Sequence, residues 1–192
     1  MKALEDAIRQ WGKGIGSDIV KVDLFLNHRI DTGLMTAMGR EIAAYFAPCS
    51  PSLVMTVEAS GIALALTTAQ ALGNIPIVFA KKHAPSTQKG LVYTQTVHSF
   101  TKGSDYQMRC SAECLEKGAR VLMVDDFLAD GEAVRGMLSI IRQAGAVPVG
   151  AGIAIEKGFQ KGGRALREEG LQILSLAAIR EIRNGEILFQ EG

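Results

Sequence analysis

The stretch "VLMVDDFLADGEA" (residues 121–133) decides how the rest of the chain is interpreted. Four apolar residues, typical of a buried strand, run directly into two carboxylates, Asp125 and Asp126. A short loop of small residues around Gly131 follows. Charge at the end of a core strand is costly, because a buried carboxylate loses its hydration. The two acids therefore either border a loop without a ligand or hold something at the carboxyl end of the strand.

Apolar strands alternate with helices on both sides of this stretch. Such alternation is typical of an α/β fold in which helices cover both faces of a mainly parallel sheet. A strand pair separated by a turn, at 91–100 and 106–110, interrupts the alternation as a hairpin. The hydrophobic periodicity predicts helices at 1–12, 31–47 (with Asp31 as N-cap), 61–73, 132–144 and 163–169, and strands at 52–58, 76–80, 120–125, 147–155 and 171–176.

The length, charge and cysteine content limit the kinds of protein that this sequence can encode. At 192 residues with 47% hydrophobic content, the chain is expected to form a single domain with a real core. A net charge of +1 without a basic cluster beyond Lys81-Lys82 gives no electrostatic footprint for nucleic acid. The three cysteines form no disulfide framework or zinc pattern, which favours a reducing cytosol.

No segment is expected to enter a membrane or a secretory pathway. Acidic residues interrupt the N-terminal amphipathic segment before a signal-peptide core can develop. The longest apolar stretches are broken at Glu58 and Gly61, too early to span a bilayer. We therefore expect a soluble, cytoplasmic protein.

Polar residues gather where three of the expected strands end, at 58–61, 81–83 and 125–133. In open parallel sheets, ligands bind at the carboxyl ends of the strands. The three clusters should therefore converge in space and form a site.

The acid pair and the loop after it suit a phosphorylated sugar. Ionised carboxylates are pure hydrogen-bond acceptors, as sugar hydroxyls require. Because consecutive strand residues point to opposite faces, we expect one of Asp125 and Asp126 to face the ligand more directly. Gly131 lets the backbone turn, and the amides of 129–133 open a helix whose N-terminus can bind phosphate. The pattern describes a pocket for ribose 5-phosphate.

Three other interpretations compete with this one. A receiver domain also has paired acids at a strand end, but it needs a later aspartate as phosphoryl acceptor, and no Asp follows Asp130. A dinucleotide-binding fold needs G-x-G-x-x-G after its first strand, and "GKGIGS" (12–17) has neither that spacing nor a preceding strand. Two solvated loop acids remain an open alternative.

These residues resemble the phosphoribosyl-pyrophosphate (PRPP) motif of the type I phosphoribosyltransferases. The likeness extends along nearly the whole chain and narrows to the bacterial xanthine branch of that family. "FLNH" and "EKGFQ" are the stretches specific to this branch. The resemblance is carried by "VKVDLFLNHRID" (20–31), "EASGIA" (58–63), "VFAKKH" (78–83), "SFTK" (99–102), "VDDFLADGEA" (124–133) and "IEKGFQ" (155–160).

The resemblance implies a type I phosphoribosyltransferase fold in one domain, 1–192, with a small hood from about 1–35 and 157–192. It implies transfer of ribose 5-phosphate from PRPP to xanthine, with Mg²⁺ bound to the PRPP substrate, in a homodimer. A guanine or hypoxanthine phosphoribosyltransferase is the alternative enzyme. A non-catalytic regulator that senses PRPP is the alternative from another class, although no DNA-binding pattern precedes the core.

Residue roles follow from the resemblance, position by position. Asp125 and Asp126 would be the catalytic residues, with their carboxylates facing the ribose hydroxyls. No protein residue is assigned to a metal. The xanthine contacts would come from Val20, Asn27, Lys157 and Phe159. The PRPP contacts would come from Ser60, Gly61, Lys81, Lys82, Ala129, Asp130, Gly131, Glu132 and Ala133.

The chain departs from the family pattern at three of these positions. Val20 stands where leucine is more frequent, a small change. Asp130 and Glu132 stand in the phosphate loop where Asn and Gln are frequent. Two carboxylates beside a phosphate repel it unless they turn to solvent or meet a cation, so the expected phosphate contacts are the backbone amides.

Overall fold

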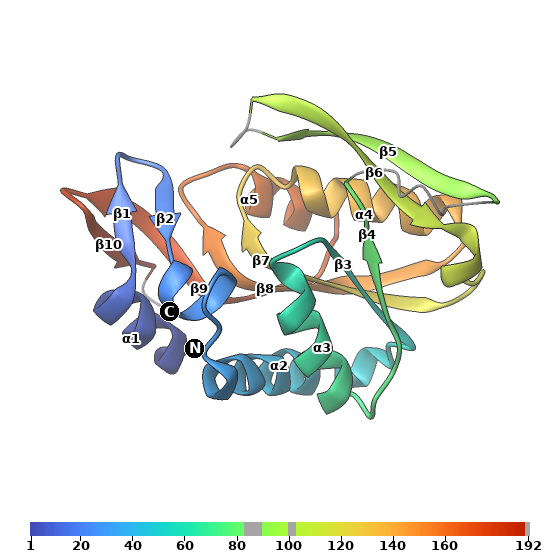
Figure 1. The fold of residues 1–192 in the computed structure, drawn as a ribbon, viewed down its shortest axis with the longest axis horizontal. Helices are drawn as coiled ribbons and strands as arrows, with labels where there is room; N and C mark the ends of the chain where they lie inside the picture. The colour runs from blue at the N-terminus through green and yellow to red at the C-terminus, as the bar shows by residue number, and fades with distance from the viewer. Residues whose placement is uncertain (83–89, 100–102, 191–192) are drawn as a thin grey trace.

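The centre of the protein is a sheet whose middle strands are buried on both faces. In the computed structural model, which describes residues 1–82, 90–99 and 103–190, the six strands lie in the order β10-β9-β8-β7-β3-β4 (Figure 1). All pairs are parallel except β10 with β9. The strands are β3 (Leu53–Val57), β4 (Ile77–Ala80), β7 (Arg120–Leu128), β8 (Val147–Lys157), β9 (Ile173–Arg183) and β10 (Glu186–Phe189).

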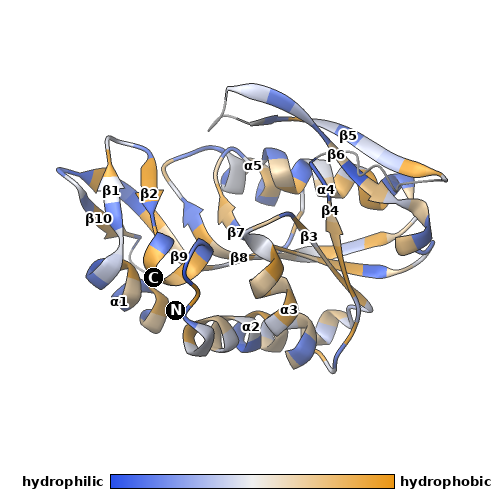
Figure 2. Cartoon of the chain, viewed as in Figure 1, coloured by the Kyte–Doolittle hydropathy of each residue, from blue (hydrophilic) through white to orange (hydrophobic). Residues whose placement is uncertain are grey.

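Helices cover both faces of this sheet, as the alternation predicts. One apolar cluster packs α1 (Lys2–Trp11), α2 (Thr32–Phe46) and α3 (Gly61–Ala71) against one face. A second cluster packs α4 (Glu132–Gln143) and α5 (Gly162–Glu168) against the other. Figure 2 shows hydrophobic and hydrophilic residues mixed along α1 and α2, as expected for helices that meet the core on one side and solvent on the other. The predicted α/β fold is confirmed.

Two hairpins lie outside the main sheet. The hairpin β5 (Val92–Ser99) and β6 (Ser104–Ser111) packs over α4 on one side of the sheet (Figure 1). This hairpin is confirmed at the predicted place. The short pair β1 (Lys13–Ile15) and β2 (Ile19–Lys21) lies beside α1 and β10 at the other end and was not predicted. Short helical turns complete the chain at η1 (Asp23–Asn27), η2 (Ala47–Cys49) and η3 (Ala112–Cys114).

The N-terminal segments gather at one end of the molecule, where the hood is expected. Helix α1 contacts β9, β10 and η1, and β1 contacts β9 and β10. Leu4 and Ile8 are fully buried, as their helical spacing predicts, whereas Trp11 is exposed and meets the Phe25 ring at 6.2 Å between centroids. The extent of the hood as a unit, 1–35 with 157–192, stays a prediction.

Most element ends lie close to the predicted ones, and the differences concentrate at the C-terminus. Asp31 caps α2 as predicted, since its side chain accepts a hydrogen bond from the Leu34 amide at 3.0 Å. Strand β7 runs three residues beyond the predicted end, so Asp125 and Asp126 lie within the strand. The strand predicted at 171–176 extends to Arg183 and returns as β10 after a turn at Asn184-Gly185.

A buried carboxylate stabilises the junction between β8 and α5. Glu156, almost fully buried, accepts two hydrogen bonds from Arg167 at 2.7 and 2.8 Å and another from the Ser175 hydroxyl. Burial by itself would raise the pKa of Glu156, but the hydrogen bonds from Arg167 and Ser175 lower it below its ordinary value. Arg135 and Glu169 form a similar bidentate salt bridge at the surface, with two hydrogen bonds of 2.7 Å.

These two pairs make a matched prediction. Arg167→Ala leaves a buried carboxylate unpaired and should lower the free energy of unfolding by about 1–3 kcal/mol near pH 7. Arg135→Ala, with an exposed partner, should lower it much less. Because the pKa of Glu156 is lowered, the pair's contribution is present above the ordinary carboxyl pKa and is lost as the pH falls through the lowered one. Denaturant unfolding of both variants across pH checks this, and equal losses would contradict it.

Candidate functional site

The acid pair lies at the carboxyl end of β7 and both members are buried. Asp125 is 7% exposed and Asp126 8%, so the expectation that one would face a ligand more directly finds no support in their exposure. The Asp126 amide donates a hydrogen bond to the Asp125 carboxylate at 3.0 Å. The expected alternative of two solvated loop acids is therefore wrong, because solvation would require exposure.

Burial of this pair carries an electrostatic cost. Burial raises the pKa of Asp125 well above its ordinary value, the charge of Asp126 raises it further, and Lys82 opposes the rise. Buried, mutually repelling carboxylates weaken the fold unless something else holds them. Their retention at a strand end is typical of a functional site.

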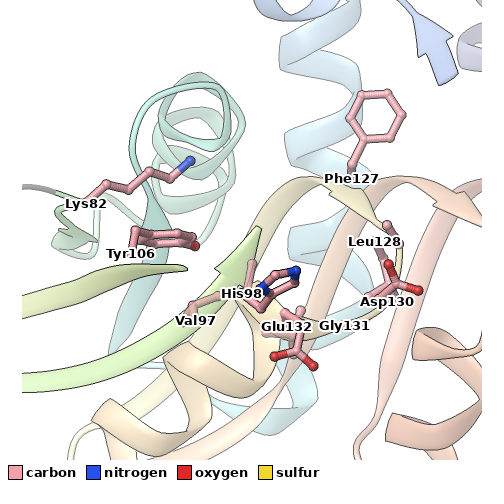
Figure 3. A pocket seen from close by; sticks show the side chains of 12 residues that line it. Lys82, Val97, His98, Tyr106, Phe127, Leu128, Asp130, Gly131 and Glu132 are labelled. Carbon is pink, nitrogen blue, oxygen red and sulfur yellow. The ribbon is translucent and has the colours of Figure 1, made fainter. Parts of the chain in front are cut away.

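The loop after β7 forms the wall of a cavity of about 200 Å³. Residues 129–133 line it together with Phe127 and Leu128 (Figure 3). Gly131 has φ of 86°, in the left-handed region that favours glycine, and is the N-cap of α4. The amides in the first turn of this 12-residue helix have no partner within the helix and can bind an anion.

Helix α5 supports this loop from behind. A Cβ added to Gly162 would meet the carbonyl oxygen of Ala129 and the backbone of Asp130 and Gly131 at less than van der Waals distance. The backbone of the loop therefore packs directly on the backbone of α5. This contact fixes the positions of the loop amides and explains why a glycine opens α5.

The second polar cluster, 58–61, meets the acid pair at the start of α3. A Cβ on Gly61 would meet the Thr56 hydroxyl and would lie 2.8 Å from the Asp125 carboxylate. Only a glycine allows this approach. The peptide between Glu58 and Ala59 is cis, and the Glu58 carboxylate accepts a hydrogen bond from the Lys82 amide at 2.7 Å. The three predicted clusters therefore converge.

The structure separates the two lysines of the third cluster. Lys82 lines the 200 Å³ cavity, and its ammonium lies 5.4 Å from the centroid of the Tyr106 ring. Lys81 places its ammonium over Phe79 instead, at 5.9 Å, and its backbone bonds to Arg109. Of the two, Lys82 is therefore the one positioned for an anion in this cavity. His83, also in this cluster, lies outside the described residues.

The four residues predicted to contact the base lie in different surroundings. Asn27 lines a second, open cavity together with Ala59 and Ser60. Lys157 lies at the end of β8; burial lowers its pKa, while the charges of Asp18 and Asp130 raise it. Val20 is buried in the apolar cluster of the α1 side, which leaves little of it for a ligand. Phe159 is 37% exposed in the turn after β8.

The two acids in the phosphate loop point away from each other. In Figure 3 the side chains of Asp130 and Glu132 leave the loop on different sides. The charge of Asp130 acts on Lys157, and that of Glu132 on Tyr106 and Arg135. Both carboxylates thus act on groups beside the loop, which leaves its backbone amides as the groups for a phosphate.

Sequence reasoning missed the residues that the β5–β6 hairpin contributes. Val97, His98 and Tyr106 line the same cavity as the phosphate loop (Figure 3). The His98 ring nitrogen Nδ1 lies 2.6 Å from the Asp105 carboxylate. Burial raises the pKa of Tyr106, and the charges of Asp125 and Glu132 raise it further. No local pattern in the sequence indicates that this hairpin reaches the cavity, and residues 100–102 of the quoted stretch 99–102 lie outside the described residues.

Residues 1–82, 90–99 and 103–190 contain no group of three or more His, Cys, Asp or Glu side chains placed to hold a metal ion. No helix among them is long and apolar enough to cross a membrane.

The buried acceptors and the free amides at this edge of the sheet suit a ligand that carries both hydroxyl and phosphate groups. The family model "Phosphoribosyl transferase domain" matches residues 27–169. The chain therefore belongs to the phosphoribosyltransferase family, a class of glycosyltransferases.

The comparisons narrow this class further. The chain is 50% identical to a xanthine phosphoribosyltransferase of Heliobacterium modesticaldum, over 98% of this chain and all of that protein. It is 49% identical to a xanthine phosphoribosyltransferase of Moorella thermoacetica, over 98% and 96%. Its fold is similar to that of adenine phosphoribosyltransferase from Giardia lamblia, with a TM-score of 0.77 and 19% identity over 91% of this chain and 97% of that one.

The buried acid pair makes a stability prediction. Asp125→Asn keeps an acceptor for the Asp126 amide and removes a buried charge, so the melting temperature at pH 8 should rise. Because the pKa of Asp125 is raised, its penalty is present above that raised value and is relieved as the pH falls through it. The gain should therefore vanish in acid. Thermal unfolding across pH, with the exposed Asp6→Asn as control, checks this; a less stable Asp125→Asn protein at pH 8 would contradict it.

Proposed function

We propose that the protein is a xanthine phosphoribosyltransferase, which joins xanthine to PRPP and releases xanthosine 5′-monophosphate and pyrophosphate. The observation that carries this proposal is the meeting of the acid pair with the loops at 58–61 and 129–133. The relatives at 43–50% identity over nearly the full chain, all named for xanthine, support the choice of base.

The reaction needs charge stabilisation rather than a nucleophilic side chain. The bond between the ribose carbon and pyrophosphate breaks with its electron pair on the leaving oxygen, and a xanthine nitrogen bonds to that carbon and loses its proton. The carbon develops cationic character on the way. Asp125 and Asp126 are suited to accept from the ribose hydroxyls and to stabilise that charge, while the loop amides hold the 5-phosphate.

Magnesium enters as part of the substrate, bound to the phosphate oxygens of PRPP. The buried carboxylates beside the site fit a substrate that brings its own cation, because they would repel a bare pyrophosphate. The ion neutralises charge on the leaving group. Lys82 adds a positive charge of the protein near the acid pair.

Base choice depends on the group at position 2 of the purine. Xanthine has a carbonyl there, guanine an amine and hypoxanthine only hydrogen. The Asn27 amide can donate to the carbonyl, and Lys157 can donate to an oxygen of a base that readily becomes anionic. An unpaired or clashing donor costs about 1–3 kcal/mol, enough to favour xanthine.

The proposal includes a cytoplasmic homodimer. The free thiols of Cys49, Cys110 and Cys114 are in keeping with a reducing compartment. Large apolar side chains on α3 and the edge strand β4, Leu66 at 47% exposure and Phe79 at 39%, are candidates for a subunit contact.

One assay tests the proposed function. The protein is mixed with PRPP, Mg²⁺ and each of xanthine, guanine, hypoxanthine and adenine, and nucleotide formation is followed. Xanthosine monophosphate formed fastest supports the proposal. A preference for guanine or hypoxanthine selects the alternative enzyme, and PRPP binding without product selects a regulator.

The phosphate loop makes a substrate-specific prediction. Gly131→Val forces a branched side chain into a left-handed backbone and against Leu166 and Gly162, which should displace the loop amides. The KM for PRPP should rise far more than the KM for xanthine. Gly170→Ala serves as control, because its φ is also positive but an added Cβ meets nothing within 4 Å. Equal changes in both KM values would indicate a general folding defect instead.

The base contacts make a specificity prediction. Lys157→Met should lower kcat/KM for xanthine about ten- to a hundred-fold more than for hypoxanthine, as expected for a charge-assisted hydrogen bond. Asn27→Ala should also penalise xanthine and spare hypoxanthine, which has nothing at position 2 to bond. The ratio of kcat/KM values for the two bases cancels general damage to the fold. An unchanged ratio in both variants would mean that these residues only shape the pocket.

A further inference from the structure

An open cavity of about 490 Å³ lies between the N-terminal segment and the start of α3. Its walls are Asp23, Asn27 and His28 on one side and Ala59 and Ser60 on the other. Asp23, His28 and Ala59 have no assigned role, and His28 is the one of these three whose side chain can donate a hydrogen bond. It lies across the cavity from the loop that meets the acid pair.

The local backbone explains why His28 faces this cavity. Residues Asp23–Asn27 form a π-helical turn, wider than an α-helix, which the amides of His28 and Arg29 close on the carbonyl of Asp23. Phe25 and Leu26, each 1% exposed, anchor the turn in the core. The two ends of the turn are thereby left on the cavity side. Wide turns of this kind occur frequently at functional sites.

The opposite wall carries the positive end of a helix dipole. Ser60 is the N-cap of α3, an 11-residue helix whose first turn has no side-chain cap, although the Ile62 amide donates to the Ala59 carbonyl at 3.2 Å. Gly61 brings this helix start against Asp125, so an anion held there lies next to the ribose site. The pyrophosphate of PRPP is attached to the ribose carbon that reacts. Under the proposed function, the leaving group therefore occupies the space between Ser60 and His28.

Charge around His28 permits this role. Asp23, on the same wall, has its carboxylate 3.4 Å from the Lys21 ammonium, which offsets its charge. Lys82 approaches the site from the side of the acid pair. An N–H of the His28 ring would approach the leaving group from the side away from Lys82.

We propose that His28 is a further substrate-contacting residue, which donates a hydrogen bond to the pyrophosphate group of PRPP across this cavity. The inference rests on the proposed function. As the bond to the ribose carbon breaks, negative charge grows on the leaving oxygen, and the His28 N–H stabilises it. The step needs no proton transfer from His28, since pyrophosphate leaves as an anion.

Three substitutions at His28 and one beside it form the test. His28→Ala removes the donor, His28→Asn keeps an uncharged donor, and His28→Lys supplies a charged donor. Arg29→Ala is the matched control, because it removes an exposed cation one residue away that is not among the residues lining the cavity. Thermal unfolding checks that all four proteins fold.

The inference predicts a defect confined to the pyrophosphate end of the substrate. His28→Ala should raise the KM for PRPP and the inhibition constant of pyrophosphate by about ten-fold each, as expected for one charge-assisted hydrogen bond. The KM for xanthine should change less than about two-fold. His28→Lys should recover most of the loss, His28→Asn part of it, and Arg29→Ala should match the wild type.

Other outcomes overturn the inference. Wild-type constants for PRPP and pyrophosphate in His28→Ala would mean a solvated surface histidine. A rise in the KM for xanthine alone would place His28 at the base instead. If the wild-type protein forms no nucleotide at all, the proposed function fails, and calorimetric titration of pyrophosphate with Mg²⁺ into wild type and His28→Ala still decides the inference: equal affinities overturn it.

Discussion

The site is arranged around two carboxylates that are held out of water at the end of a core strand. Asp125 and Asp126 lie within β7 with less than a tenth of their surface exposed, and their charges repel. The neighbours adapt to them. Position 61 must be glycine because the Asp125 carboxylate approaches the start of α3, and Lys82 offsets part of the negative charge. A ligand that brings hydroxyl donors and a cation would relieve the remaining cost, so the arrangement that costs stability also suits the substrate.

The phosphate loop differs from the acid pair, because it offers backbone amides rather than side chains to a ligand. Gly131 takes a left-handed conformation that directs the loop into α4, and Gly162 of α5 supports it without an intervening side chain. Asp130 and Glu132 leave the loop on different sides (Figure 3). The chain can therefore carry two acids in this loop, because amides are available to a phosphate whichever side chains they belong to.

The parts of this architecture that follow from local chemistry could be predicted from the sequence. Continuous apolar runs identify the buried strands, the Asp31 cap begins α2, and the small loop at Gly131 begins α4. The structure also confirmed that the polar strand ends converge, because parallel strands end at one edge of the sheet. The burial of both acids could not be predicted. The alternation of side chains along a strand gives the face toward which each one points, but it does not show that the start of α3 packs on Asp125.

Other features depended on long-range contacts or weak local signals. Strand β10 and the Asn184-Gly185 turn were not predicted. Apolar and charged residues do not alternate regularly on both sides of this turn, although Asn-Gly is itself a hairpin signal. The π-helical turn has no simple sequence pattern, so the position of His28 was not foreseen. The hairpin was predicted, but nothing local indicates that His98 and Tyr106 reach the phosphate loop.

The central claim is that the buried acid pair exists for the substrate and not for the fold. The most direct test is the double variant Asp125→Asn/Asp126→Asn, with xanthine transfer and thermal unfolding measured on the same preparation. The account predicts that kcat/KM falls more than about 100-fold, because sugar acceptors and charge stabilisation are lost together, while the melting temperature at pH 8 is equal to or above that of the wild type. Near-normal turnover, or lost turnover in a protein that melts well below the wild type, would contradict it.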